Sequence, residues 1–127
     1  MRAKPRGFLL ALALLATPAS AGPAHDHDHA PGPHGGRVED AGAWHAELVT
    51  KGDAVSVYLS DGGGKPLPVE GFKAVAILKA GTKALRIPLL PESGRLAGRA
   101  EAPLGDQPTG ALRITAPDGA TASARFD

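Results

Sequence analysis

The sequence predicts an all-β domain, arranged as a small antiparallel β-sandwich of the immunoglobulin-like kind with about seven strands. Its 17 Gly and 12 Pro make up almost a quarter of the 127 residues, and both residue types are poor helix formers. Apolar residues recur at every second position in short runs, and turn-forming residues separate these runs about every 8–12 residues. This alternation is typical of half-buried strands, each of which gives one face to a shared core.

The folded domain is expected over residues 37–127, where the alternation is found. Its clearest strand covers 53–60, in which three apolar residues share one face. The turn sequences at 80–81 and 117–119 indicate two hairpins. The basic residues of 65–125 are scattered rather than clustered, which indicates solvated strand faces. The seven expected strands cover 44–49, 53–60, 72–79, 82–90, 95–101, 112–116 and 121–126.

Residues 1–21 have the features of a secretory signal peptide. Three basic residues occur within the first six positions, an apolar run of nine follows at 8–16, and Ala19-Ser20-Ala21 supplies the small residues that a signal peptidase reads. An apolar run of this length is too short to cross a bilayer, which needs about 20 residues. We therefore expect an exported chain, periplasmic or secreted, with no membrane insertion after the signal is cleaved.

Charge and cysteine content exclude several classes of protein. Removing residues 1–21 takes three of the 14 basic residues and leaves all 13 acidic ones, so the processed chain has a formal net charge of −2. This balance gives no general attraction for nucleic acid. The absence of Cys excludes disulfides, cysteine-based zinc fingers and cysteine nucleophiles. No paired acid and base or activated nucleophile can be assembled from the sequence, so we do not expect an enzyme.

A histidine tract follows the signal. Residues 22–36 are rich in Gly, Pro, His and Asp and have almost nothing to bury, so we expect a flexible tail. Within it His25, His27 and His29 alternate with Asp, and His34 extends the set. Imidazole is a good ligand for Zn²⁺, Cu²⁺, Ni²⁺ and Co²⁺. The tract predicts metal capture of modest affinity, because binding must order the backbone. The alternative interpretation is a solvated tail that binds no ion.

A second candidate is the pair His45 and Glu47, two positions apart on an expected strand. Both project from the same face, and because Trp44, Ala46 and Leu48 should point to the core, we expect this face to be solvated. A His beside a carboxylate is half of a metal site, which the tail could complete, and is equally an ordinary exposed pair. No Cys is present and the one Met is lost with the signal, so the processed chain has no sulfur ligand. The remaining nitrogen and oxygen ligands favour Zn²⁺ or Cu²⁺, then Ni²⁺ or Co²⁺.

The position of signal cleavage affects this chemistry. Cleavage after Ala21 is the expected event. Cleavage after Gly22 would leave His25 third from a free amine, an arrangement that binds Cu²⁺ or Ni²⁺ in a square plane. The mass of the secreted chain distinguishes the two products.

Several short motifs resemble those of a known group of proteins. The motifs are His34-Gly35-Gly36, Trp44-His45-Ala46-Glu47-Leu48-Val49, Val57-Tyr58-Leu59, Gly64-Lys65-Pro66 and Ser123-Ala124-Arg125-Phe126. With them, residues 34–127 resemble small exported proteins of heavy-metal efflux, and are similar to the N-terminal β-sandwich domain of cobalt–zinc–cadmium-type efflux adaptor subunits. The chain lacks the long hairpin and barrel segments of a full adaptor. The resemblance implies a metal-handling setting and leaves open which of His34, His45 and Glu47 binds.

The sequence supports two classes of function. In the first, the chain is an exported metal-binding accessory protein whose His tract captures a divalent ion, with an efflux adaptor as the partner that the resemblance implies. In the second, the domain is a non-catalytic interaction module that docks an efflux adaptor or another envelope protein by strand addition at an exposed edge, without binding metal.

Overall fold

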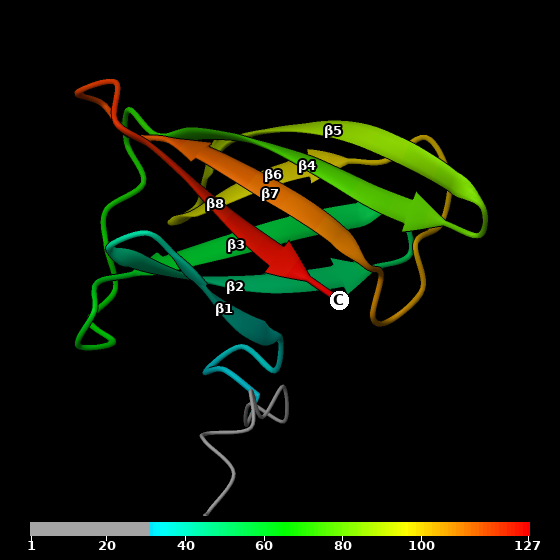
Figure 1. Ribbon diagram of the computed structural model, residues 1–127, viewed down its shortest axis with the longest axis horizontal. Coiled ribbons are helices and arrows are strands. Elements are labelled where there is room, and N and C mark those ends of the chain that lie inside the picture. The colour runs from blue at the N-terminus through cyan, green and yellow to red at the C-terminus, as the bar shows by residue number, and fades with distance from the viewer. Residues whose placement is uncertain (1–30) are drawn as a thin grey trace, which may run out of the picture.

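The computed structural model describes residues 31–127, and this part of the chain confirms the all-β class (Figure 1). Between residues 31 and 127 there is no helix, and so none that could span a membrane. The expected signal at 1–21 and the residues His25, His27 and His29 lie outside the described residues. The strands are β1 (Arg37–Ala41), β2 (Trp44–Lys51), β3 (Ala54–Ser60), β4 (Lys73–Ala80), β5 (Lys83–Glu92), β6 (Arg95–Arg99), β7 (Gly110–Thr115) and β8 (Thr121–Phe126).

The strands form one antiparallel sheet that is nearly closed, so the domain resembles a barrel and not the two-sheet sandwich that we expected. The order is β1-β2-β3-β6-β5-β4-β7-β8. The sheet is continuous because of β5, which is ten residues long. This strand pairs with β4 along its first part and with β6 along its last three residues. One continuous strand therefore joins the two halves. The outer strands β1 and β8 lie side by side (Figure 1), and Arg37 sits 5.4 Å from the centroid of the Phe126 ring.

All seven expected strands are found, and β1 is an eighth that the alternation did not reveal. Three of its five residues are charged, so it has no apolar face of its own. It forms a hairpin with β2, in which Ala41 is the register partner of Trp44. Gly42 in the turn has a φ of 59°, a conformation that glycine adopts without steric penalty. A short charged strand at the edge of a sheet is typical of proteins that avoid edge-to-edge association.

The two expected hairpins are confirmed, and the alternating residues form the core. Ala80 pairs with Lys83 across the first turn, and Thr115 pairs with Thr121 across the second. The core runs through the middle of the barrel, where burial of each large aliphatic or aromatic side chain contributes about 1.5–3 kcal/mol. The largest fully buried side chains are Phe126, Leu78, Ile87, Leu89, Leu96, Leu112, Ile114, Val55, Val57 and Val69.

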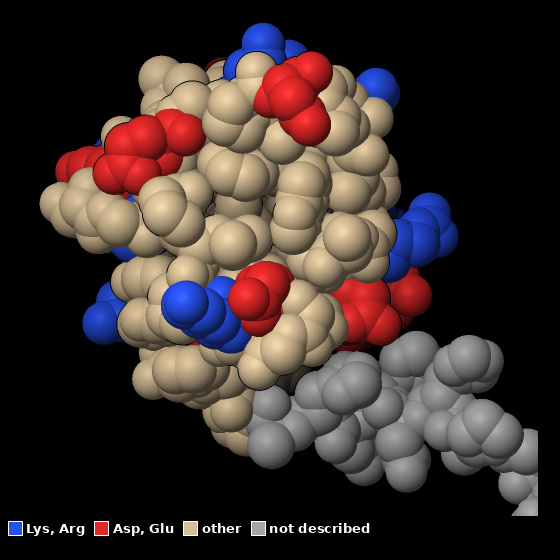
Figure 2. Space-filling view, turned by 90° about the vertical axis from the view of Figure 1, so that its left-hand side faces the viewer, with Lys and Arg blue, Asp and Glu red and all other residues tan. Residues whose placement is uncertain are grey.

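The surface at one end of the barrel has a mixed charge. Figure 2 looks onto the end that carries the loop after β3 and the turn between β7 and β8. Lys and Arg side chains are interspersed there with Asp and Glu, and uncharged residues occupy most of the area between them. This end of the barrel therefore has no dominant sign of charge.

Candidate functional site

The chain enters the barrel through a tight turn at residues 32–36. The amide of Gly35 donates to the carbonyl of Gly32 at 2.9 Å, and the amide of Gly32 donates to the carbonyl of Gly36 at 2.9 Å. Gly35 has a φ of 78°. A Cβ atom at Gly36 would overlap the carbonyl oxygen of Leu48, so glycine is needed there for the turn to lie against β2. The folded part of the chain thus begins before residue 37, within the segment that the sequence predicts as tail.

Glu47 holds this turn in place. Its Oε2 accepts hydrogen bonds from the amides of His34 and Gly36, each at 2.8 Å, and its Oε1 lies 2.8 Å from Nδ1 of His34. The side chain is buried, with only 4% of Glu47 exposed. The expectation that this side chain faces solvent is therefore wrong. Glu47 does point away from the core, as the alternation predicts, but residues 32–36 fold over it and exclude water.

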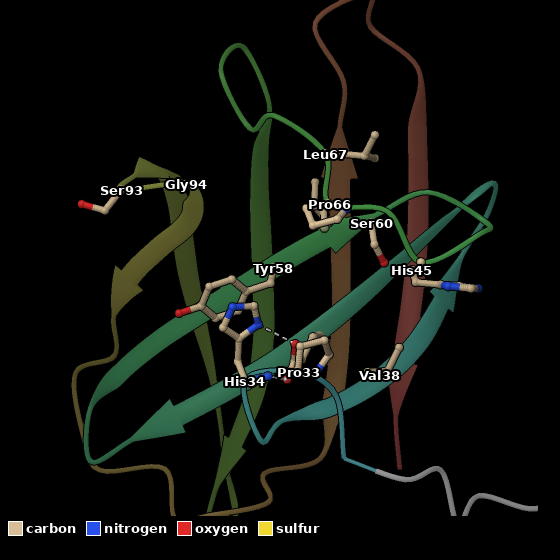
Figure 3. A pocket seen from close by; sticks show the side chains of 13 residues that line it. Pro33, His34, Val38, His45, Tyr58, Ser60, Pro66, Leu67, Ser93 and Gly94 are labelled. Carbon is tan, nitrogen blue, oxygen red and sulfur yellow. Dashed lines mark hydrogen bonds and ion pairs between the residues drawn. The ribbon is translucent and has the colours of Figure 1, made fainter.

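His34 is oriented by two contacts. Its ring stacks on Tyr58 with 3.5 Å between centroids and 7° between planes (Figure 3). A carboxylate accepts hydrogen bonds, so Nδ1 is the donor in this pair, and in the neutral form of the imidazole the lone pair is then on Nε2. The side chain remains 45% exposed. A histidine whose second nitrogen donates to a carboxylate has the arrangement that is usual for metal ligands in proteins.

His45 makes a separate pair. Its Nε2 lies 3.1 Å from Oδ1 of Asp40, its register partner on β1, and this Asp side chain is 87% exposed. Although His45 and Glu47 share a face of β2, as expected, their side chains have different partners. Figure 3 shows His45 pointing away from His34. Within residues 31–127 no group of three or more His, Asp or Glu side chains is placed to hold a metal ion by itself.

A pocket of about 400 Å³ lies beside these residues. Its walls are mostly apolar, with Val38 from β1, Leu59 from β3 and Leu67 from the following loop. His34 and His45 both contribute to its lining (Figure 3). The pocket thus offers an apolar surface next to one oriented imidazole and one imidazole that is paired with Asp40.

Tyr58 belongs to one of the short motifs, but nothing in the sequence was a reason to include it in the site. In the structure it is the register partner of Glu47 across β2 and β3, so its ring stands beside the carboxylate and supports His34. The signal that could have found it is the pairing of these two strands, since side chains directly opposite each other on one face are in contact.

Comparison with protein-family models, with curated proteins and with solved structures found no match. The similarity to efflux adaptor domains therefore stays a prediction from the short motifs.

Proposed function

We propose that this chain is an exported accessory protein that captures divalent transition-metal ions through its N-terminal His tract, with His34 as the fixed ligand at the folded end. The observation that carries the proposal is the His34–Glu47 pair. A buried carboxylate selects the tautomer of His34, a stacked ring fixes its orientation, and Nε2 has no hydrogen-bond partner among residues 31–127.

The remaining ligands come from the tract. His29 is five residues before His34, and an extended chain spans at most about 3.6 Å per residue, so their Cα atoms are at most about 18 Å apart. The same limit is about 32 Å for His25, and in this proposal the Gly- and Pro-containing tract turns back toward the ring of His34. One ligand that is already oriented reduces the ordering penalty of binding, because fewer side chains must be immobilised when the ion is captured.

The donor set determines which ions suit the site. Imidazole nitrogen and carboxylate oxygen are the donors in the tract, and thiolate and thioether sulfur are absent once Met1 is removed. Zn²⁺ and Cu²⁺ are the favoured ions, with Ni²⁺ and Co²⁺ next. Binding weakens in mildly acid solution, because protons compete for free imidazole, whose ordinary pKa is about 6.5.

The proposed role is to hold the ion in the periplasm or outside the cell and to transfer it to an efflux system. A tract of modest affinity releases its ion readily to a tighter site. No catalytic step is part of this proposal. The interaction-module alternative stays a prediction, and its strand-addition form would need an edge at β1 or β8, two strands that lie against each other.

The test is isothermal titration of the processed chain with Zn²⁺, Cu²⁺ and Ni²⁺ at neutral pH. We expect submicromolar binding that is lost when residues 22–33 are deleted. The control is a chain in which all five His are replaced by Ala. Metal binding no stronger than that of the control would overturn the proposal. A second experiment tests the interaction module: the chain is used to pull down envelope proteins in the presence of chelator. Capture of a partner that is unchanged when His25, His27 and His29 are replaced by Ala would favour the interaction module.

A further inference from the structure

Five of the nine basic residues that are scattered over 65–125 lie on one face of the barrel. In β4, β5, β7 and β8 the buried residues alternate with outward ones, and the fold brings the outward positions of these four neighbouring strands together. We call this surface the basic face. Its exposed cationic side chains are Lys73, Lys79, Arg86, Arg113 and Arg125.

The strand register sets the spacing of these charges. Ile77 is at the centre, with Arg86 as its partner on β5 and Ala111 as its partner on β7. Arg113 is opposite Val75, and Arg125 is opposite Ala111 on β8. Neighbouring strands are about 4.8 Å apart, so the face is about 14 Å wide. This width is close to the screening length of about 10 Å at 0.1 M salt, so the fields of cations on neighbouring strands add.

Acidic residues are absent from the paired part of this face. The nearest ones along these strands are at the ends: Glu92 at the end of β5, Asp118 in the turn after β7, and Asp127 after β8, which lines a hollow together with Lys79 and Arg125. None of the five cations has an ion-pair partner among residues 31–127. The processed chain has a formal net charge of −2, and one end of the barrel has a mixed charge (Figure 2). The basic face is therefore a local concentration of positive charge.

Aliphatic side chains protrude between the cations. Ile77 is 41% exposed, and Leu90, further along β5, is 62% exposed. A hollow of about 310 Å³ next to Ile77 is lined by Arg86, Arg113 and Ser123. The two guanidinium groups and the hydroxyl around this hollow are hydrogen-bond donors, and a phosphate group accepts hydrogen bonds from such donors. Guanidinium binds phosphate in a bidentate manner.

From this arrangement we infer that the basic face docks on the surface of an anionic phospholipid bilayer. Cations around isolated aliphatic side chains suit a layer of phosphate head groups above hydrocarbon, since the charges contact the head groups while Ile77 and Leu90 enter the boundary. The outward positions of the basic face have no aromatic residue, so the docking rests on the cations and on these two aliphatic side chains. The inference does not depend on metal capture.

The experiment is sedimentation of the processed chain with vesicles, in the presence of chelator so that the His tract contributes no metal bridge. We expect binding to vesicles of equal phosphatidylglycerol and phosphatidylcholine, none to pure phosphatidylcholine, and release at about 1 M salt, where the screening length is about 3 Å. Each cation near an anionic surface changes affinity about fivefold, so R86Q/R113Q should weaken binding about 25-fold.

The matched control is K51Q/K65Q, which removes the same charge from exposed lysines outside the basic face and should leave binding unchanged. I77S should weaken binding several-fold while keeping its salt dependence. Equal losses in the two double variants, or equal binding to both kinds of vesicle, would overturn the inference. Binding to polyglutamate together with none to anionic vesicles would also overturn it and would indicate an acidic protein partner.

Discussion

His34 and His45 each lie beside a carboxylate, but the two pairs have different surroundings. Glu47 is buried and accepts three hydrogen bonds at 2.8 Å, two of them from backbone amides. Asp40 is 87% exposed and has one contact, at 3.1 Å, with His45. A buried carboxylate with full hydrogen bonding organises its neighbours, whereas an exposed ion pair contributes about 0–1 kcal/mol. The comparison shows that the partner's burial, and not its chemical type, separates an oriented imidazole from an ordinary surface pair.

The largest effect expected from this difference is on folding stability. Glu47→Ala removes the acceptor of three donors, and we expect the free energy of unfolding to fall by about 3 kcal/mol, because the turn must then rearrange to solvate its amides. Asp40→Ala should change it by less than about 0.5 kcal/mol. Urea unfolding followed by tryptophan fluorescence measures both values. Similar losses in the two variants would show that Glu47 has no special role.

A second difference concerns metal affinity. His34→Ala should weaken Zn²⁺ binding about tenfold, because it removes the proposed ligand whose ring is already oriented, whereas His45→Ala should have little effect. Titration calorimetry of the two variants under identical conditions measures the ratio. A larger loss in His45→Ala would make His45, and not His34, the folded residue that takes part in metal binding.

A smaller effect is expected at Tyr58, because among residues 31–127 no aromatic ring stacks on His45 in the same way. Tyr58→Leu loses the stacked contact with His34 and should lower the free energy of unfolding by about 1 kcal/mol. Tyr58→Phe keeps the ring and serves as the control. Thermal or urea unfolding measures both, and equal values for Leu and Phe at this position would show that stacking does not hold the imidazole.

The sequence was sufficient to predict the strands whose apolar residues alternate. It was not sufficient to predict the burial of a side chain where that burial depends on tertiary contacts. Val55, Val57 and Leu59 are buried as predicted, because each strand needs one apolar face. Glu47 was placed in solvent because alternation gives only the side of the strand, and the turn that covers that side is made of residues with no hydrophobic signal. In the same way, alternation cannot show that β5 continues from one half of the sheet into the other.

The basic face was missed for a related reason. Its residues are separated by up to 52 positions, from Lys73 to Arg125, and only the pairing of β4 with both β5 and β7 makes them neighbours. Charge clustering along a sequence finds patches on single elements. It does not find those that strand register assembles.

The stacking of His34 on Tyr58 also gives the molecule an internal optical probe. The chain has one Tyr and one Trp. The tyrosine touches the imidazole that we propose as a ligand, while the tryptophan packs edge-on against Phe72. A paramagnetic ion such as Cu²⁺, if held at His34, would quench tyrosine emission first, so a single unlabelled sample could report both whether an ion binds and on which side of the barrel it sits.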